Sequence, residues 1–395
     1  MGPLVRSAPV VTAVTPSSPD LSDSFWQGRR VLLTGHTGFK GSWLALWLRC
    51  LGAEVLGVAL PADTQPSLYE ELLLEQGHDL AGCLRSQLLD LADLPALKAA
   101  VLAFEPQVVF HLAAQPLVRL SYAEPLTTWN TNVIGTLHLL EALRPLPQPC
   151  AVVAVTTDKV YRNQEWCYGY RENDPLGGHD PYSSSKAAAE LLIQSWRQSF
   201  CGALPHQTPN LAVATARAGN VIGGGDWARD RIVPDAMRAC ASGASLTLRN
   251  PSSTRPWQHV LEPLSGYLLL AQRLWQAQQL GASGELELLA AAWNFGPPLA
   301  SNATVQQLVE ALHASWPGSW RDASDPQAPH EAGLLHLVTD KAHHQLGWAP
   351  RWDLATTAKR TARWYQRVQG GAAPLACCLE DLEAYLKAAA PPPVA

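Results

Sequence analysis

From Arg30 to Ala216 the chain alternates short, continuously apolar segments with longer segments that have helical spacing. Strands that are apolar along their whole length are typical of a parallel sheet with helices on both faces. The pattern therefore predicts an α/β fold with a Rossmann-type, doubly wound parallel sheet. In such a sheet the ligand lies at the carboxyl ends of the strands, near the point where the strand order reverses.

Element positions follow from this periodicity. The predicted strands are Val31–Thr34, Glu54–Leu60, Gln87–Asp90, Gln107–Ala113, Ala151–Thr157 and Leu211–Ala216. The predicted helices between them are Ser42–Leu51, Leu94–Ala103, Pro125–Leu143 and Ser183–Phe200. After Asn220 the loops become rich in Gly, Pro, Trp and Arg, and further helices are predicted at Asp230–Ser242, Glu262–Ala277, Thr304–Ala314 and Thr356–Val368. This second part reads as a smaller C-terminal region that covers the ligand edge of the sheet.

Composition excludes several classes of protein. With 47% hydrophobic and 16% charged residues the 395-residue chain is expected to be globular. A net charge of -5 argues against a nucleic-acid partner, which would need a basic face. No apolar run reaches membrane-spanning length, so we expect no membrane partner. The eight cysteines contain no C-x-x-C pair, which predicts reduced thiols, a cytoplasmic location and no metal site.

A glycine-rich segment follows the first predicted strand and opens a helix. Its glycines permit a tight turn and a close approach of the backbone to a pyrophosphate, which the helix N-terminus then faces. An isolated G-x-x-G-x-x-G match is equally consistent with a plain turn, but its place in a βαβ unit favours dinucleotide binding. The predicted cofactor-binding residues here are Gly35, Thr37, Gly38, Phe39, Lys40 and Gly41.

The next strand ends refine the choice of cofactor. No Arg or Lys follows the second strand to pair with a 2′-phosphate, which favours NAD over NADP. The first acid there, Asp63, comes late for a ribose contact. We assign further cofactor contacts after the third and fourth strands. The alternative after the third strand is a solvated loop acid, and the alternative after the fourth strand is a well-packed turn. These contacts are Asp90, Leu91, Ala113, Ala114 and Gln115.

Reactive side chains follow the fifth strand. The first group is Thr157, Asp158 and Lys159. The two charges could form a plain surface ion pair, but they lie at the ligand edge of the sheet, which favours a role in a binding site. Tyr182 and Lys186 are spaced i, i+4 and share one face of the next helix. For the Tyr182 hydroxyl to act as a base, its pKa must fall by about three units, or roughly 4 kcal/mol, which an adjacent ammonium and a cationic nicotinamide could supply.

Together, the glycine segment and the residues Thr157, Tyr182 and Lys186 resemble the extended short-chain dehydrogenase/reductase superfamily over roughly residues 25 to 370. Three segments are similar to the CDP-glucose branch of its sugar-nucleotide dehydratases. They are Thr34–Trp43, Thr157-Asp158-Lys159 and Arg217–Trp227, and Arg255–Val260 adds to the likeness. Asp-Lys after the fifth strand is the feature typical of that branch.

The resemblance implies NAD-dependent dehydration of CDP-glucose to the 4-keto-6-deoxy sugar nucleotide and water. Oxidation at C4, elimination across C5 and C6 and return of hydride to C6 would use Thr157, Asp158, Lys159, Tyr182 and Lys186 as catalytic residues. We assign Asp158 as the acid for the 6-hydroxyl and Lys159 as the base for C5. Further contacts are predicted for the cofactor at Arg217, and for the substrate at Asn220, Arg229, Arg231 and Arg255.

Two other functions are consistent with parts of this pattern. A nucleotide-sugar 4-epimerase would share the fold, cofactor and tyrosine, but would not need the pair Asp158-Lys159. A catalytically dead dinucleotide sensor would keep the glycine segment but would not need Tyr182 and Lys186. The resemblance also implies a homodimer, or a homotetramer, that pairs through the helices Pro125–Leu143 and Ser183–Phe200.

The predicted domain organisation has four parts. Residues 1–24 form a disordered N-terminal arm, and residues 25–218 form the NAD-binding Rossmann domain. Residues 219–385 form mainly the substrate-binding region, part of which returns to the Rossmann sheet. Residues 386–395 form a loose tail.

Overall fold

The computed structural model describes residues 24–74, 84–202, 207–208, 210–324 and 334–388. Most of the predicted arm, residues 1–24, and the end of the predicted tail, from residue 389, lie outside the described residues. No helix in the described ranges is long and apolar enough to cross a bilayer.

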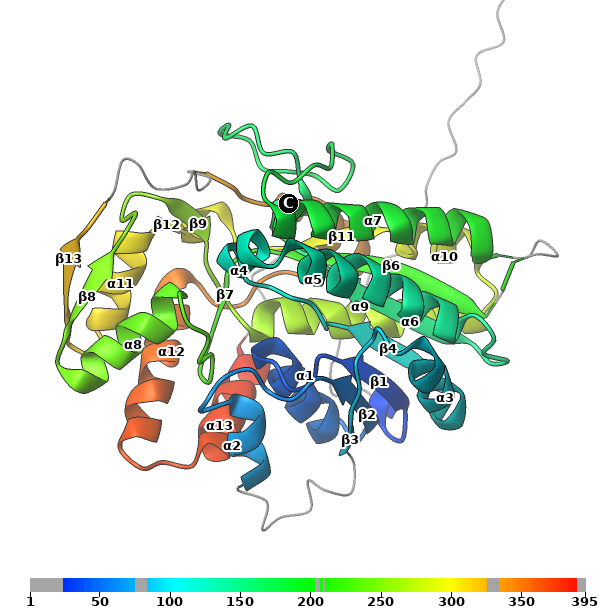
Figure 1. The fold of residues 1–395 in the computed structure, drawn as a ribbon, viewed down its shortest axis with the longest axis horizontal. Helices are drawn as coiled ribbons and strands as arrows, with labels where there is room; N and C mark the ends of the chain where they lie inside the picture. The colour runs from blue at the N-terminus through cyan, green and yellow to red at the C-terminus, as the bar shows by residue number, and fades with distance from the viewer. Residues whose placement is uncertain (1–23, 75–83, 203–206, 209, 325–333, 389–395) are drawn as a thin grey trace, which may run out of the picture.

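A seven-stranded sheet, parallel at every pairing, forms the centre of the molecule (Figure 1). Its order is β11-β6-β5-β4-β1-β2-β3, so the order reverses between β1 and β4. This confirms the predicted doubly wound α/β fold. The strands are β1 (Arg30–Thr34), β2 (Glu54–Ala59), β3 (Leu84–Leu88), β4 (Val108–His111), β5 (Cys150–Val155), β6 (Leu211–Ala218) and β11 (Ala292–Phe295).

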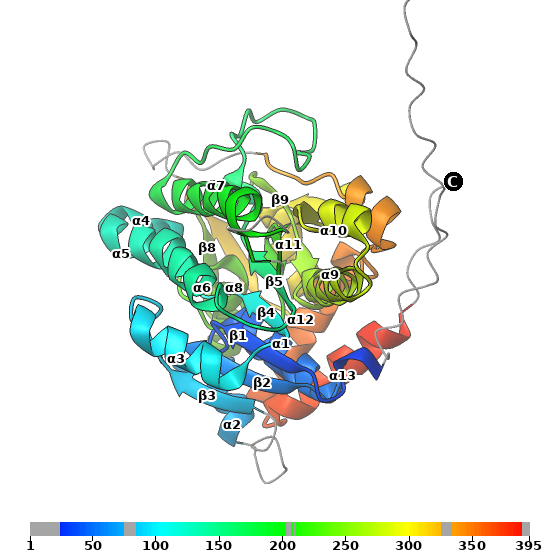
Figure 2. The same cartoon turned by 90° about the vertical axis from the view of Figure 1, so that its right-hand side faces the viewer.

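Helices cover both faces of the sheet, as Figure 2 shows. Alternate residues of β4 point into different cores: Val108 and Phe110 into one, Val109 into the other. The second face is covered by α3 (Leu94–Phe104), α6 (Gly135–Leu143) and α7 (Pro181–Phe200). The first face is covered by α1 (Phe39–Cys50) and α9 (Leu261–Gln279), behind which α13 (Pro374–Lys387) packs.

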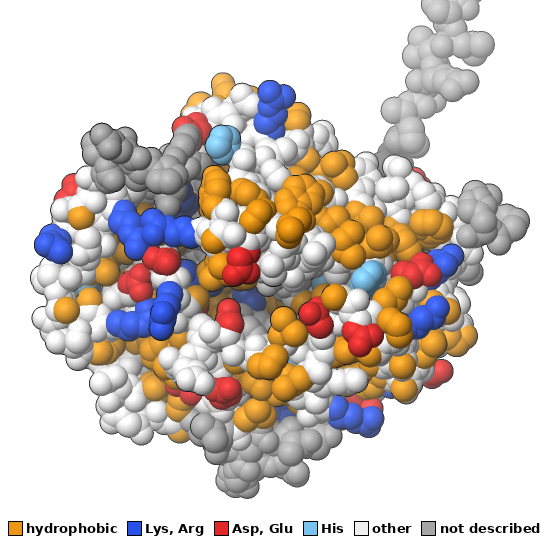
Figure 3. Space-filling model, viewed as in Figure 1, with side chains coloured by type: hydrophobic (Ala, Val, Ile, Leu, Met, Phe, Trp, Pro, Cys, Tyr) orange, Lys and Arg blue, Asp and Glu red, His pale blue; other side chains and the backbone are white. Residues whose placement is uncertain are grey.

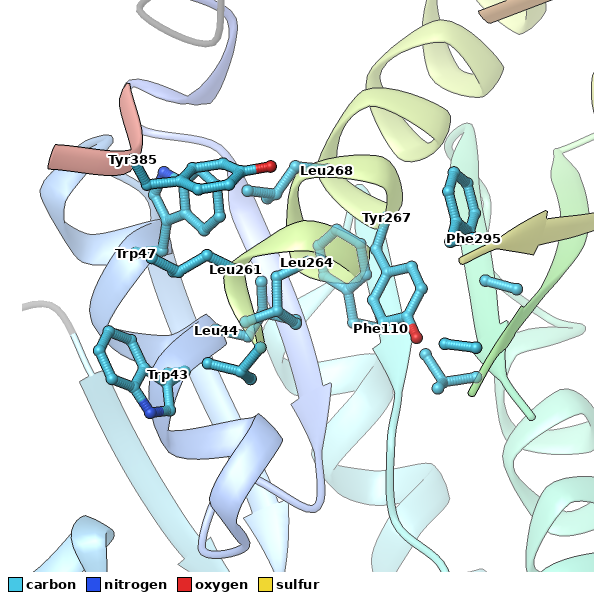
Figure 4. Packing of buried hydrophobic residues seen from close by; sticks show 14 of the residues in the cluster. Trp43, Leu44, Trp47, Phe110, Leu261, Leu264, Tyr267, Leu268, Phe295 and Tyr385 are labelled. Atoms are coloured by element: carbon cyan, nitrogen blue, oxygen red, sulfur yellow. The ribbon is translucent and has the colours of Figure 1, made fainter. Parts of the chain in front are cut away.

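The first core is rich in large side chains (Figure 4). Trp43 and Trp47 of α1 lie on one side of α9, with Trp47 next to Tyr385 of α13, while Phe110 and Phe295 of the sheet lie near Tyr267 on the other side. Trp47 and Tyr385 pack edge to face, with ring centroids 5.8 Å apart. This packing joins the C-terminal helix to the N-terminal half of the sheet.

A smaller region follows β6 and lies beyond the carboxyl ends of the strands (left in Figure 1). Its strands form short pairs: β10 with β7, β12 with β9, and β13 with β8. The strands are β7 (Val221–Ile222), β8 (Ser245–Leu248), β9 (Thr254–Pro256), β10 (Gln258–His259), β12 (Asn302–Thr304) and β13 (Ser319–Asp322). Its helices are α8 (Ile232–Ser242), α11 (Val305–His313) and α12 (Leu354–Gln369).

Several predicted boundaries differ from the structure. The third strand, predicted at Gln87–Asp90, runs over Leu84–Leu88; it is the exposed edge of the sheet, so its apolar pattern is weak. The predicted helix Pro125–Leu143 is divided into α5 (Pro125–Trp129), a π-helical turn η3 (Asn130–Ile134) and α6. Helices that the periodicity did not reveal are α2 (Leu68–Leu74), α4 (Val118–Ala123), α10 (Ser283–Leu289) and α13. Short helical turns complete the fold: η1 (Ser24–Trp26), η4 (Asp158–Val160), η5 (Leu299–Ser301) and η6 (Ala342–Leu346).

Candidate active site

The glycine segment packs tightly against the neighbouring strand ends. Gly35 has a positive φ of 76°, and a Cβ there would lie 2.6 Å from the backbone nitrogen of Ala113 after β4. A Cβ on Gly41 would lie 2.0 Å from the Gly35 carbonyl oxygen. These two positions therefore need glycine so that β1, β4 and the first turn of α1 can approach one another.

Gly38 is different, because its missing side chain leaves space. A Cβ there would meet only the Gly35 carbonyl oxygen, at 3.5 Å, within 4 Å. Gly38 is the N-cap of the 12-residue α1 and supplies no side-chain cap. Free backbone N–H groups and the positive end of the helix dipole thus face a small hollow. This arrangement fits one phosphate group of a dinucleotide.

The other predicted cofactor residues have clear roles within the chain. The Thr37 hydroxyl donates to the Leu60 carbonyl (2.9 Å), and Phe39 and Ala114 are partly buried. Asp90 is exposed and accepts a hydrogen bond from the backbone of Ala92, whereas Leu91 is buried. The Gln115 side chain donates to Thr128 (2.8 Å) and orders the loop after β4.

The turn after β5 carries a buried carboxyl group. Thr157 donates to Oδ1 of Asp158 (3.0 Å), while Oδ2 of Asp158 is buried and has no hydrogen-bond partner. Burial raises the pKa of Asp158, although the charges of Lys159 and Arg255 and the Thr157 hydrogen bond act to lower it. A carboxyl group in this state is suited to donate a proton to a ligand.

Tyr182 and Lys186 lie on the first turns of α7, on the face towards this turn. Asp180 caps the helix, and the Tyr182 backbone N–H donates to the Ser121 hydroxyl (3.1 Å). Burial raises the pKa of Tyr182 to about 12, against the lowering effect of its hydrogen bond with Thr157. The chain alone therefore leaves the pKa of Tyr182 raised, and the expected lowering still requires the positive charge of a bound nicotinamide.

Several cationic side chains lie close to Tyr182 and Lys186. Burial and the charges of Lys186 and Arg231 lower the pKa of Lys40 to about 7, and its ammonium donates to the Tyr267 hydroxyl (3.1 Å). Burial lowers the pKa of Lys186 to about 8. The charge of Arg231 acts on Tyr182. Mutual repulsion among buried cations would be relieved by an anionic ligand.

The predicted substrate residues are not all equivalent. Arg231 pairs with Asp226 (2.9 Å) beside Tyr182, and Arg255 is close enough to lower the pKa of Asp158. Arg229 is exposed, and Asn220 is partly buried at the end of β6.

Two other residues named in the sequence interact with charged groups of the chain itself. Arg217, assigned to the cofactor, is buried and pairs with Glu190 of α7 (2.9 Å). Asp63 is exposed and its charge acts on Arg231.

One polar residue of this neighbourhood, Asn132, was not predicted from the sequence. Asn132 is buried in the π-helical turn η3, accepts from the Gln115 backbone (2.8 Å) and donates to the Ser185 hydroxyl (2.9 Å). It thus joins the loop after β4 to the helix that carries Tyr182. An amide inside an otherwise amphipathic helical pattern was the available signal. In the described ranges no cluster of His, Cys, Asp and Glu could hold a metal ion.

Comparison with known proteins identifies relatives of this chain. The CDP-glucose 4,6-dehydratase of Salmonella typhimurium is 46% identical over 370 residues, which cover 93% of this chain and 99% of the relative. This confirms the resemblance to the CDP-glucose branch. The dTDP-glucose 4,6-dehydratase of Streptomyces antibioticus is 31% identical over 70% of this chain and 75% of its own.

Solved structures share the fold. A dTDP-glucose 4,6-dehydratase from Streptomyces venezuelae with NAD bound has a TM-score of 0.70 at 24% identity, covering 88% of this chain and 99% of its own. A UDP-glucose 4-epimerase from Stenotrophomonas maltophila with bound NAD has a TM-score of 0.71 at 21% identity, covering 87% and 100%. The family model described as GDP-mannose 4,6 dehydratase matches residues 32–361. With that match over most of its length, the chain belongs to the GDP-mannose 4,6 dehydratase family.

Proposed function

We propose that the protein is a hydro-lyase that converts CDP-glucose, with NAD as cofactor, to CDP-4-dehydro-6-deoxyglucose and water. The 46% identity to a CDP-glucose 4,6-dehydratase over nearly the full length of both chains supports the substrate and the reaction. The fold alone does not separate dehydratases from epimerases, since solved structures of both match with nearly equal TM-scores.

The observation that favours dehydration over epimerisation is the buried environment of the Asp158 carboxyl group. Its carboxyl group is buried beside Thr157, its Oδ2 has no partner, and burial raises its pKa. Elimination of the 6-hydroxyl as water needs a proton donor at such a place, whereas epimerisation at C4 does not. Lys159, the next residue, is proposed as the base that removes the C5 proton.

The residues around α1 fit NAD. Gly35 and Gly41 bring the backbone close, and the hollow at Gly38 with the α1 N-terminus suits the pyrophosphate. Lys186 is proposed to hold the nicotinamide ribose. When bound, NAD would accept hydride from C4 of the sugar and return it to C6.

Proton transfer is the task of the chain's own side chains. Tyr182 is proposed to take the proton of the sugar 4-hydroxyl, next to Thr157, which hydrogen-bonds with it. Because burial holds its pKa at about 12 in the chain alone, bound positive charge must lower it towards neutrality. Once C4 is a ketone, Lys159 takes the C5 proton and Asp158 protonates the leaving hydroxyl.

The cations beside the catalytic residues are proposed to face the substrate's two phosphates. Arg231 and Arg255 act electrostatically on Tyr182 and Asp158, so a diphosphate near them would also lie near the reacting sugar. Arg229 and Asn220 stay candidates for the same ligand.

A coupled observation of product and cofactor tests this function. Purified protein is incubated with CDP-glucose and a catalytic amount of NAD, and the ketosugar is followed by its absorbance in alkali. We expect stoichiometric ketosugar without net NADH. Stoichiometric NADH would contradict dehydration, and interconversion at C4 without ketosugar release would favour the epimerase. NAD binding with no turnover of CDP-glucose would favour the non-catalytic sensor.

We also propose a homodimer, or a dimer of such dimers, formed through α4 to α7. Large apolar side chains are exposed on these helices, and Figure 3 shows apolar surface gathered over α5 and α7. They are Leu120, Tyr122, Leu126, Trp129, Ile134 and Leu191. An apolar face of this extent is typical of a protein interface.

A cytoplasmic location is supported by the seven described cysteines, which are free thiols.

A further inference from the structure

A buried ion pair lies behind the turn that carries Thr157, Asp158 and Lys159. Glu190 of α7 and Arg217 of β6 are each about 2% exposed. The guanidinium binds the carboxylate through two hydrogen bonds of 2.9 Å, Nε to Oε1 and Nη2 to Oε2. Burial alone would raise the pKa of Glu190, but the charge of Arg217 holds it below the usual value. The pair with Arg217 therefore favours the ionised form of Glu190 in the interior.

This pair holds both ends of the turn. On one side the Thr156 hydroxyl donates to Oε1 of Glu190 at 2.5 Å. On the other side Nη1 of Arg217 donates to the Tyr161 hydroxyl at 2.8 Å, and Tyr161 donates onward to Asn294 of β11 at 2.7 Å. The turn's own backbone hydrogen bonds are long, 3.4 Å from Val160 and 3.5 Å from Tyr161. Backbone hydrogen bonds of 2.9 Å from Thr156 to Ala216 and 2.8 Å from Gly177 to Val160 also fix its ends, and the flanking side chains add to them.

The same carboxylate acts on Lys186. Glu190 lies one helical turn after Lys186 on α7, and its charge raises the pKa of Lys186 while burial lowers it to about 8. Two other titratable groups face Lys186. His111 of β4 is held uncharged by burial and by the Lys186 charge, and Lys40 of α1 repels it. Arg197 and Arg217 face Glu190 on its other side.

We propose that Glu190 is a positioning residue for the reaction, which joins Lys186 to the turn that carries Thr157, Asp158 and Lys159. The proposal rests on the proposed dehydratase function. It gives Arg217 a role within the protein, as the partner that keeps Glu190 charged and in place. Displacing the turn by about an ångström would misalign the acid and base with the sugar, a change that can cost ~100-fold in rate.

Two threonines provide a matched test, because both donate to Glu190. Thr156 binds Oε1 and flanks the turn, whereas Thr215 binds Oε2 at 2.8 Å from within β6, and both side chains are buried. Thr156→Val and Thr215→Val remove the same group from the same carboxylate. We expect Thr156→Val to lower kcat roughly tenfold or more at nearly unchanged KM, and Thr215→Val to stay within about twofold of the parent. Equal losses in the two variants would overturn the proposal.

The link to Lys186 is tested by charge. Glu190→Gln keeps the shape but removes the anion, so the pKa of Lys186 falls and the alkaline limb of the kcat profile moves down by about one pH unit. Glu190→Asp keeps the charge and should leave that limb in place. A loss of activity in Glu190→Gln that is uniform across pH would mean a merely structural role.

The controls separate the possible failures. Thermal unfolding checks that each variant folds, and if Glu190→Gln does not, the threonine pair still decides. An inactive parent protein would count against the proposed function, whereas an active parent with equal threonine variants would count only against this inference.

Discussion

Two glycines of the same segment, Gly38 and Gly41, should respond in opposite ways to the addition of one methyl group. A Cβ on Gly41 would lie 2.0 Å from the Gly35 oxygen and 2.8 Å from Cα of His36, so backbone must move. Overpacking of this kind costs about 1–3 kcal/mol or more. A Cβ on Gly38 would contact only one oxygen, at an ordinary 3.5 Å. The backbone of Gly38, at φ -82° and ψ 168°, is open to alanine.

Gly38→Ala should therefore fold like the parent but bind NAD poorly. Alanine in place of glycine at an N-cap costs ~1 kcal/mol at most, so Tm should fall by no more than about 3 °C. The methyl group would occupy the hollow proposed for the pyrophosphate and weaken NAD binding roughly tenfold or more, since ~1.4 kcal/mol corresponds to a factor of ten. Gly41→Ala should instead lose several times as much in Tm.

Calorimetric titration with NAD and thermal unfolding measure the two effects. Gly284 of α10 provides a matched control, because a Cβ there meets nothing within 4 Å. Gly284→Ala should leave NAD binding unchanged and should not lower Tm, because alanine favours a helix over glycine. If Gly38→Ala binds NAD as the parent does, the pyrophosphate does not approach Gly38. If Gly38→Ala unfolds as early as Gly41→Ala, the hollow is not free space.

Three further predictions concern catalysis and stability. Tyr182→Phe should lower turnover by ~100-fold or more, and a variant within about threefold of the parent would refute the tyrosine's role. The variants Asp158→Asn and Lys159→Met should still oxidise C4 and accumulate enzyme-bound NADH, which is visible by near-ultraviolet absorbance. If Lys159 is the base, only Asp158→Asn should still exchange the C5 hydrogen with deuterated solvent. Turnover as fast as that of the parent in both variants would favour the epimerase. Burial raises the pKa of Glu262 from 4.5 to about 7, against the lowering effect of hydrogen bonds from Arg351, Trp352 and Tyr385, so stability is greatest at low pH and roughly 3 kcal/mol at most is lost as pH rises from about 4.5 to 7. Glu262→Gln should flatten the dependence of Tm on pH between 5 and 8, and an unchanged slope would contradict this.

The fold could be predicted from the sequence because each buried strand is marked by the apolar residues of its own short segment. Continuous apolar runs at β1, β4 and β5 predict buried strands, since such segments cannot face water on either side. The edge strand β3 was misplaced by three residues at its start because its side chains are largely exposed and carry no such pattern. The π-helical turn at Asn130–Ile134 was missed because its periodicity differs from that of an α-helix by too little to read over five residues.

The candidate catalytic residues were also readable in sequence, because strand ends of a parallel sheet share one edge. Thr157-Asp158-Lys159 and Tyr182 with Lys186 needed only the order of the elements to be placed together. Their protonation states needed the tertiary structure. Burial raises the pKa of Asp158 and Tyr182, and it lowers that of Lys186 to about 8; the extent of burial depends on the whole packed chain.

The partners of buried charges were likewise decided only by tertiary structure. The resemblance assigned Arg217 to the cofactor, and the structure pairs it with Glu190, 27 residues away on another element. Sequence alone determined which residues carry reactive groups and at which edge of the sheet they gather. Which of those groups faces a ligand, and which holds another in place, depends on long-range packing that no local pattern encodes, because a buried charge must find its partner wherever the fold brings one.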